Sequence, residues 1–305
     1  MAMTTDMPQS FCPLTGEEGV VRRTRTADEL ASSYASYHGR ALPRQLVEKY
    51  FTKTVREFEC SVSGLRWFDP ASMGETDLYE WLSSSFDWYY SSETWDKKQA
   101  LECLQRLGSR VFVEVGSGNG AFLRMAKARG ISGVGVDINE EAIRRCRGEG
   151  LVVAHPSELA TINVRPDTLV SLQSLEHVDD PVRYLNRLVT DFPVDTLIIS
   201  VPSSESLLAY TDDPLVWPPH HFTLWSQKAF EVLAQRLGYR LIETHRDRLS
   251  YPAYLASSSN PSHGLDGLPK LRGRILGKLG FRYFRLRGFH WARHLHSLLV
   301  VLKKH

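Results

Sequence analysis

Short apolar runs alternate with helical segments through the second part of the chain. The runs begin after the first 110 residues and stand at 111–115, 133–137, 151–154, 168–172 and 196–201. Strands that are buried on both faces have such continuous apolar runs, and strands that alternate with helices form parallel sheets. Because parallel crossovers are right-handed, the pattern predicts a doubly wound α/β sandwich.

The end of the alternation differs from its beginning. A helix is expected after Ser226, a favourable N-cap residue, and Gly238 stands at its end. The strand 239–245 follows, but no ordinary helix lies between it and the next apolar strand at 296–304. We therefore expect these two strands to pair as an antiparallel hairpin that carries a basic insertion at about 250–295.

The chain is expected to have two parts and to be cytoplasmic. Residues 1–94 lack the alternation and should form a small N-terminal α+β region, and residues 95–305 should form the main domain. The composition, 42% hydrophobic and 24% charged, is ordinary for a soluble protein. Four scattered cysteines do not resemble a disulfide framework, and neither a signal peptide nor a membrane-spanning run is visible.

The glycine-rich stretch EVGSGNG at 114–120 follows the first predicted strand. Dinucleotide sites have the spacing G-x-G-x-x-G/A; the glycines here follow G-x-G-x-G, although Ala121 keeps the dinucleotide pattern formally possible. The carboxylate of Glu114 would repel pyrophosphate but would suit an ammonium group. Asp137, at the end of the second strand, could accept hydrogen bonds from ribose hydroxyls. A ribose, an amino group and no phosphate together favour S-adenosylmethionine.

Two motifs carry a resemblance to a known family. VEVGSGNG resembles the first motif of the class I S-adenosylmethionine-dependent methyltransferases, and GVGVD resembles the acidic end of their second strand. The resemblance covers about 111–245 and 296–304, and the late antiparallel hairpin is part of it. It implies a Rossmann-like, seven-stranded methyltransferase sheet and S-adenosylmethionine as the methyl donor.

The resemblance also implies which residues bind the donor. Gly116 and Gly118 would line its methionine portion, while Glu114 would bind its amino group and Asp137 its ribose. The family often has an acidic residue near the adenine after the third strand, but this chain has AHPSEL there. The other candidate donor contacts are Ser157 in that segment, Gln173, and Tyr89 and Tyr90 as lid residues, for which aromatic packing is the alternative.

Histidines follow two strands at the edge where open α/β sheets bind ligands. LQSLEHVDDP (172–181) resembles the LEHxxDP segment of a branch that includes sugar C-methyltransferases and quinone-pathway O-methyltransferases, which suggests His177 as base or acceptor contact. The alternative is that Glu176 and His177 only brace the next helix. The loop WPPHHFTLWS adds His220 and His221 as candidate catalytic residues. Some quinone-pathway relatives are thought to use a divalent ion near the corresponding Glu-His, so an ion held by Glu176, His177 and a loop histidine is an alternative. No i, i+4 ligand spacing is present, and no metal ion is predicted.

The N-terminal region contains two related turns, CPLTG (12–16) and CSVSG (60–64). With cysteines at Thr15 and Ser63 they would form a four-thiolate zinc ribbon. Members of the same branch often begin with such a ribbon, followed by a stretch like GLRWFDP at 64–70. Two thiolates alone do not hold structural zinc tightly, so we expect a packed, metal-free remnant that helps to seat the acceptor.

The C-terminal part is basic. Residues 267–305 contain ten Lys or Arg and no Asp or Glu. Residues 270–293 could form a marginal amphipathic helix that contacts an anionic membrane or an anionic substrate, or they could be a solvated insertion. Nucleic acid is the least favoured partner, because the rest of the chain is acidic and no known nucleic-acid-binding motif is present.

The sequence therefore predicts an S-adenosylmethionine-dependent methyltransferase. Its acceptor is expected to be a small molecule, and the basic segment favours an anionic one. The leading hypothesis for the reaction is C- or O-methylation of a sugar-derived or other specialised metabolite. A quinone- or lipid-linked O-methyltransferase at a membrane surface is one alternative. The others are a nicotinamide-dependent enzyme and a non-catalytic donor-binding protein.

Overall fold

The structure is a computed structural model of the chain. It describes residues 9–86, 89, 93–161, 164–206, 209, 213–248 and 294–305. The predicted basic segment at 270–293 and Tyr90 lie outside the described residues.

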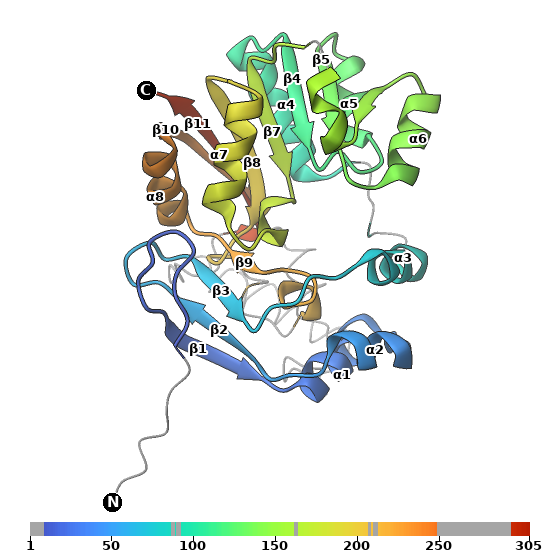
Figure 1. Ribbon diagram of the computed structural model, residues 1–305, viewed down its shortest axis with the longest axis vertical. Helices are drawn as coiled ribbons and strands as arrows, with labels where there is room; N and C mark the ends of the chain where they lie inside the picture. The colour runs from blue at the N-terminus through green and yellow to red at the C-terminus, as the bar shows by residue number, and fades with distance from the viewer. Residues whose placement is uncertain are drawn as a thin grey trace, which may run out of the picture.

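A seven-stranded sheet forms the larger part of the molecule (Figure 1), with the strand order β10-β11-β8-β7-β4-β5-β6. Its strands are β4 (Val111–Val115), β5 (Ser132–Val136), β6 (Val152–Ala154), β7 (Thr168–Leu172), β8 (Thr196–Pro202), β10 (Tyr239–Arg248) and β11 (His294–Lys304). The five strands from β4 to β8 are parallel, and β11 is antiparallel to both of its neighbours, β8 and β10. This arrangement confirms the predicted doubly wound α/β sheet with a late antiparallel hairpin.

Helices cover both faces of this sheet. One face packs on α4 (Trp95–Leu107), α5 (Ala121–Lys127) and α6 (Glu140–Gly148), and the other on α7 (Pro181–Asp191) and α8 (Gln227–Leu237). Successive side chains of a strand point to opposite faces. In β4, Phe112 accordingly packs in the cluster around α4, α5 and α6, whereas Val113 packs in the cluster around α7 and α8.

The predicted ends of α8 are confirmed. The Ser226 side chain accepts a hydrogen bond from the Ala229 amide, and Gly238 ends the helix with a φ of 73°. A glycine tolerates this left-handed conformation, and it lets the chain turn directly into β10. No helix in the described part of the chain is long and apolar enough to cross a membrane.

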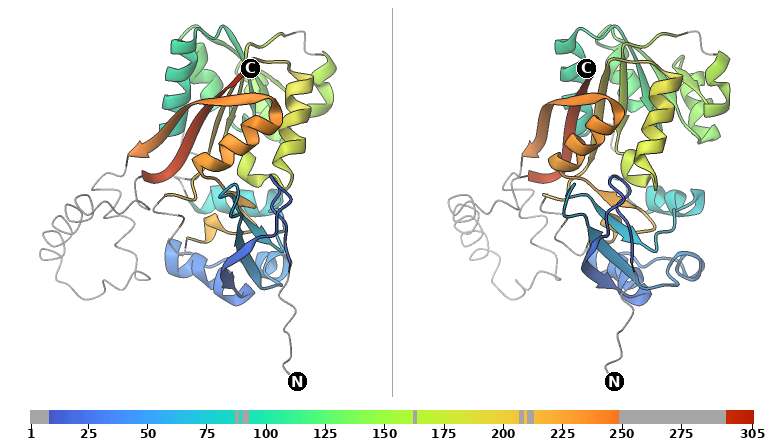
Figure 2. Two further views of the ribbon diagram at one scale, coloured as in Figure 1. Left: turned by 90° about the vertical axis from the view of Figure 1, so that its left-hand side faces the viewer. Right: turned by 60° about the vertical axis from the view of Figure 1, so that its left-hand side comes forward.

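A second, antiparallel sheet has the order β1-β2-β3-β9. It consists of β1 (Val20–Arg25), β2 (Val55–Glu59), β3 (Arg66–Asp69) and β9 (Thr223–Leu224), and α1 (Ala27–His38), α2 (Arg44–Tyr50) and α3 (Thr76–Ser85) accompany it. Its strand β9 belongs to the segment that follows β8 of the main sheet. Figures 1 and 2 show this smaller sheet beside the edge at which β7 and β8 end.

Candidate active site

The glycine turn is held by the carboxylate at the end of the next strand. The Gly118 amide donates a hydrogen bond to Asp137 Oδ2 over 2.7 Å, and the Asn139 amide donates one to Oδ1 over 2.8 Å. The Gly116 amide bonds to the Val136 carbonyl over 2.9 Å. The turn and the end of β5 therefore form one unit, with the Asp137 carboxylate at its centre.

The turn lies close to the segment that follows β7. Gly116 has a φ of 77°, and a Cβ added there would overlap the Ser174 side chain. Gly118 has a φ of 49°, and a Cβ added there would meet nothing within 4 Å. The first glycine is therefore needed for a close approach within the protein, and the second leaves open space beside the turn.

Glu114 is a buried carboxyl group with an unsatisfied oxygen. Its side chain is buried, and Oε2 has no hydrogen-bond partner among the described residues. Burial raises the pKa of Glu114 well above its ordinary value; Lys97 opposes this rise, and Asp137 adds to it. An ammonium group bound beside Glu114 would favour its charged form. The open space at Gly118 and this unsatisfied oxygen fit a ligand that carries an amino group.

The other predicted donor contacts are spread around the same edge. Ser157 lies in the 3-10 helix η1 (Pro156–Thr161), where its hydroxyl is 2.8 Å from His155 Nδ1. Gln173 has a φ of 52°, and its amide nitrogen donates hydrogen bonds to the hydroxyls of Ser200 and Ser297. A positive φ in a residue other than glycine, at the end of a sheet strand, is a feature that clusters at functional sites.

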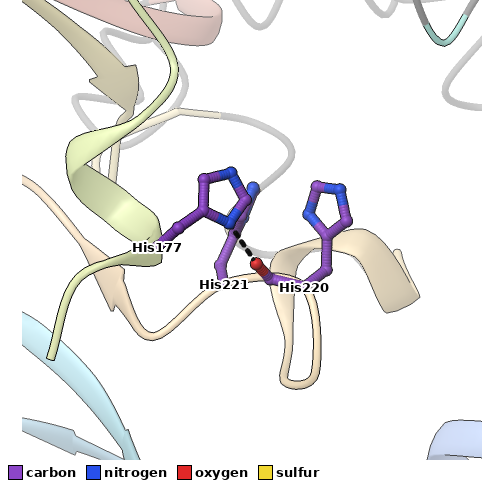
Figure 3. Close-up of side chains that lie close together, drawn as sticks. All are labelled: His177, His220 and His221. Carbon is purple, nitrogen blue, oxygen red and sulfur yellow. Dashed lines mark hydrogen bonds between the residues drawn. The ribbon is translucent and has the colours of Figure 1, made fainter. Parts of the chain in front are cut away.

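The structure brings the three predicted catalytic histidines together (Figure 3). The ring centroids of His177 and His220 are 5.2 Å apart, those of His177 and His221 are 5.1 Å apart, and those of His220 and His221 are 4.4 Å apart. His177 ends the 3-10 helix η2 (Leu175–His177), which follows β7. Its Nδ1 lies 2.6 Å from the His220 carbonyl oxygen. A carbonyl oxygen only accepts, so Nδ1 carries the proton and Nε2 carries the lone pair.

Backbone hydrogen bonds hold the histidine loop against two other segments. The Phe222 amide donates to the Glu176 carbonyl over 2.8 Å, which ties the loop to η2. The Phe68 amide of β3 donates to the Phe222 carbonyl over 3.1 Å. The Gly74 amide donates to the Pro219 carbonyl over 2.8 Å. The positions of His220 and His221 therefore depend on the N-terminal region.

The imidazoles are uncharged near neutral pH. Burial lowers the pKa of His177 to about 4, and it lowers the pKa values of His220 and His221 well below their ordinary range. Glu176 is also buried, with 1% of its surface exposed, and burial raises its pKa well above the ordinary value. The cluster therefore consists of neutral, proton-accepting rings beside a carboxyl group whose charged form is disfavoured by burial.

Two tyrosines contact the cluster. The Tyr89 hydroxyl is 2.7 Å from His220 Nε2, and the Tyr79 ring packs edge-on against His177, with centroids 6.2 Å apart. The sequence predicts Tyr89 as a lid residue over the donor. Tyr79 was not identified from the sequence, because nothing in the surrounding TDLYEWL distinguishes it from a residue of an ordinary amphipathic helix.

The two ribbon-like turns face each other. Cys12 Sγ lies 3.5 Å from Ser63 Oγ, and Thr15 Oγ1 lies 3.4 Å from Cys60 Sγ. Both cysteines are free and buried. Hydrogen bonds to Cys60 lower the pKa of its thiol to about 7 against the opposing effect of burial, which is the largest single influence. The four positions of a zinc ribbon thus converge, with a thiol and a hydroxyl from each turn.

Comparison with known proteins identifies the family. Residues 68–244, more than half of the chain, match a family model described as a methyltransferase domain. No curated protein matches the sequence.

Several solved structures are distantly similar to this chain in their fold. An S-adenosylmethionine-dependent methyltransferase from Archaeoglobus fulgidus is 18% identical, with a TM-score of 0.48 over 75% of this chain and 100% of that one. A magnesium protoporphyrin IX methyltransferase from Synechocystis PCC 6803 is 13% identical, with a TM-score of 0.47 over 76% of this chain and 100% of that one. At these identities and TM-scores, nothing about the acceptor follows from the likeness. On the family match, the chain belongs to the methyltransferase domain family and is an S-adenosylmethionine-dependent methyltransferase.

Proposed function

We propose that this methyltransferase acts on a small-molecule acceptor held beside His177, His220 and His221. The leading version is C- or O-methylation of a sugar-derived or other specialised metabolite. The observation that carries the proposal is the cluster of three neutral imidazoles at the edge of the sheet where β7 ends, in which His220 and His221 are buried and His177 is partly exposed. Neutral imidazole is a suitable group for removing a proton from an acceptor.

The donor and acceptor sites are adjacent in this proposal. Ser174, three residues before His177, lies against Gly116 of the glycine turn. We assign Glu114 to the amino group of the donor, Asp137 to its ribose, and Gly116 and Gly118 to its methionine portion. When bound, the donor supplies a methyl group on a positively charged sulfur, so the protein has mainly to position the acceptor and to take its proton.

His177 is the residue best prepared to take that proton. Its Nδ1–H is fixed on the His220 carbonyl, which leaves Nε2 as the proton acceptor. A pKa of about 4 keeps His177 neutral but makes it a weak base. The proposed acceptor must therefore have a proton that is more acidic than that of an ordinary alcohol, as a phenol or an enol has.

Two measurements test this function. Calorimetry should detect binding of S-adenosylhomocysteine, with the nicotinamide dinucleotides as controls. Transfer of a labelled methyl group should then be screened over keto-sugar nucleotides and phenols. His177→Ala should lower transfer at least about 100-fold, the usual contribution of a general base, with unchanged affinity for S-adenosylhomocysteine.

The control variant is His305→Ala, which changes an exposed histidine at the end of the chain. It should transfer methyl groups at the rate of the unchanged protein. Full transfer by His177→Ala would refute the assigned role. Donor binding without transfer to any acceptor would favour a non-catalytic donor-binding protein, and transfer only to lipid-linked acceptors would favour an enzyme at a membrane surface.

A further inference from the structure

His177, His220 and His221 form a cluster with the composition and geometry of a metal site. One nitrogen from each ring lies within 4.8 Å of those of the other two. We propose that these three imidazoles bind one divalent transition-metal ion, beside the carboxyl group of Glu176. The inference deepens the proposed function, because the ion would act on the acceptor, but binding of the ion itself requires neither donor nor acceptor.

The hydrogen bonds leave the right nitrogens available. His177 donates its Nδ1–H to the His220 carbonyl, so the lone pair of Nε2 is available to an ion. His220 Nε2 is 2.7 Å from the Tyr89 hydroxyl, while His220 Nδ1 has no hydrogen-bond partner. Figure 3 shows the His220 ring facing the other two. Metal-binding histidines typically donate the other ring N–H to a carbonyl or similar group, as His177 does here.

Several buried polar atoms around the cluster are unsatisfied. His220 Nδ1, His221 Nδ1 and both oxygens of Glu176 have no hydrogen-bond partner among the described residues. Glu176 Oε1 is 4.0 Å from His177 Nε2. Each such group is costly to bury, and an unseen ion is one of the explanations that unsatisfied groups in a native protein call for. One cation would engage the two nitrogens directly and would stabilise a charged Glu176.

The geometry requires only a modest adjustment. Bonds of about 2.0–2.1 Å to a tetrahedral ion place the ligand nitrogens roughly 3.4 Å apart. The three nitrogens would therefore close by at most about 1.4 Å, a distance within the reach of side-chain rotation. Imidazole with a nearby carboxylate suits zinc, iron(II) or nickel(II) rather than magnesium or calcium.

An ion at this position would change the chemistry of the acceptor. Three protein ligands leave a coordination position open, as in catalytic zinc sites. An acceptor hydroxyl at that position would lose its proton more readily, because the positive charge lowers its pKa. Because Nε2 of His177 would then bind the ion, the proton would pass to the adjacent Glu176 carboxylate instead of to His177, and the range of acceptors would widen to ordinary hydroxyl groups.

Thiol-containing groups provide the necessary comparison. Cys103, Glu243 and His245 also lie within ligand distance of one another. There, however, the Glu243 carboxylate forms an ion pair with Arg106, and its Oε2 is 3.0 Å from His245 Nε2. The negative charge of Glu243 is therefore already balanced without an ion. Cobalt bound to thiolates gives a sulfur-to-metal charge-transfer band, whereas cobalt bound to imidazoles gives visible d–d bands without it. The spectrum therefore distinguishes the histidine cluster from the group of Cys103 and from Cys12 and Cys60 in the ribbon-like turns.

The test uses the full chain after treatment with a chelator. Co²⁺ is added while the visible spectrum is recorded, and Zn²⁺ competition gives the affinity. We expect one Co²⁺ per chain with d–d bands and without the thiolate band. His220→Gln and His221→Gln should each weaken binding at least about 100-fold. His305→Ala and His245→Ala should leave it unchanged.

Failure of the metal site and failure of the proposed function would give different results. The variants should keep the thermal unfolding transition and the affinity for S-adenosylhomocysteine of the unchanged protein, which shows that they are folded. Absence of Co²⁺ binding, a thiolate band that His245→Ala removes, or binding that survives both glutamine variants would each overturn the metal site. Failure to bind S-adenosylhomocysteine would instead contradict the donor assignments and would leave the cobalt result standing.

Discussion

Replacing Thr15 and Ser63 with cysteine should create a four-thiolate zinc site from the two ribbon-like turns. The hydroxyl oxygens already lie 3.4 and 3.5 Å from Cys60 Sγ and Cys12 Sγ. Zinc–sulfur bonds of about 2.3 Å place tetrahedral ligands about 3.8 Å apart, so the observed separations differ from this by only a few tenths of an ångström. The amides of Gly16 and Gly64 bond to the Cys12 and Cys60 carbonyls over 2.8 Å, which fixes both turns.

The expected stabilisation follows from mass action. Zinc at 100 times its dissociation constant stabilises the folded protein by about 2.7 kcal/mol. For a chain of 305 residues, 1 kcal/mol shifts the melting temperature by about 1.6 °C, so the rise should be about 4 °C. Cys12 and Cys60 belong to the same core cluster as α8 and the main sheet, so the gain should stabilise the whole molecule.

Thermal unfolding of Thr15→Cys/Ser63→Cys should be compared in buffered zinc and in chelator, with each single variant as a control. The double variant should bind one more zinc per chain than the unchanged protein, and cobalt should show the thiolate band. The single variants, with three thiols, should show a smaller rise or none. A folded double variant without additional zinc would refute the interpretation of these turns as a converted ribbon.

Four variants test the donor assignments. Asp137→Ala should lower the affinity for S-adenosylhomocysteine at least about 100-fold, because it removes both the proposed ribose contact and the bond to the Gly118 amide; an unchanged affinity in calorimetry would contradict the assignment. Gly116→Ala should abolish donor binding and lower the free energy of unfolding in urea by about 1–3 kcal/mol, because φ is 77° and the new methyl group would overlap Ser174. Gly116→Ala/Ser174→Ala should recover part of that loss, since it relieves the overlap. Because burial raises the pKa of Glu114, the folded chain should hold an additional proton above the unfolded pKa, and its stability should fall as pH rises towards the folded value. Donor binding should release this proton, seen as a dependence of the binding heat on the ionisation heat of the buffer, and Glu114→Gln should remove that dependence.

The main sheet could be predicted because its information is local. The runs 111–115 and 168–172 are bounded by turns and are too apolar to be exposed, and both form strands with those bounds. The hairpin of β10 and β11 was predictable for the same reason, despite the long segment between them. In contrast, β9 has only two residues, and no periodic pattern marks so short a strand.

The histidine cluster could be predicted only in part. The sequence places His177 and the pair His220 and His221 beside strand ends and leaves a metal ion among them as an alternative, but it has no i, i+4 ligand spacing to support one. The rings come from two segments more than forty residues apart, and their approach depends on the bonds that Phe222 makes to Glu176 and Phe68. Contacts of this kind leave no period in either segment.

These bonds give the N-terminal region a specific role in the site. Strand β3 pairs with β9 through Arg66 and Trp67, and the next residue, Phe68, donates its amide to Phe222, which follows the two histidines. The turn at 60–64 precedes β3 directly and packs in the same core cluster as Trp225. Displacement of that turn would therefore be transmitted through β3 to the loop that carries His220 and His221, and it would strain the bonds that tie this loop to Glu176 and His177. Packing of the turn thus helps to set the distance between the imidazoles, whether or not the turn holds a metal ion.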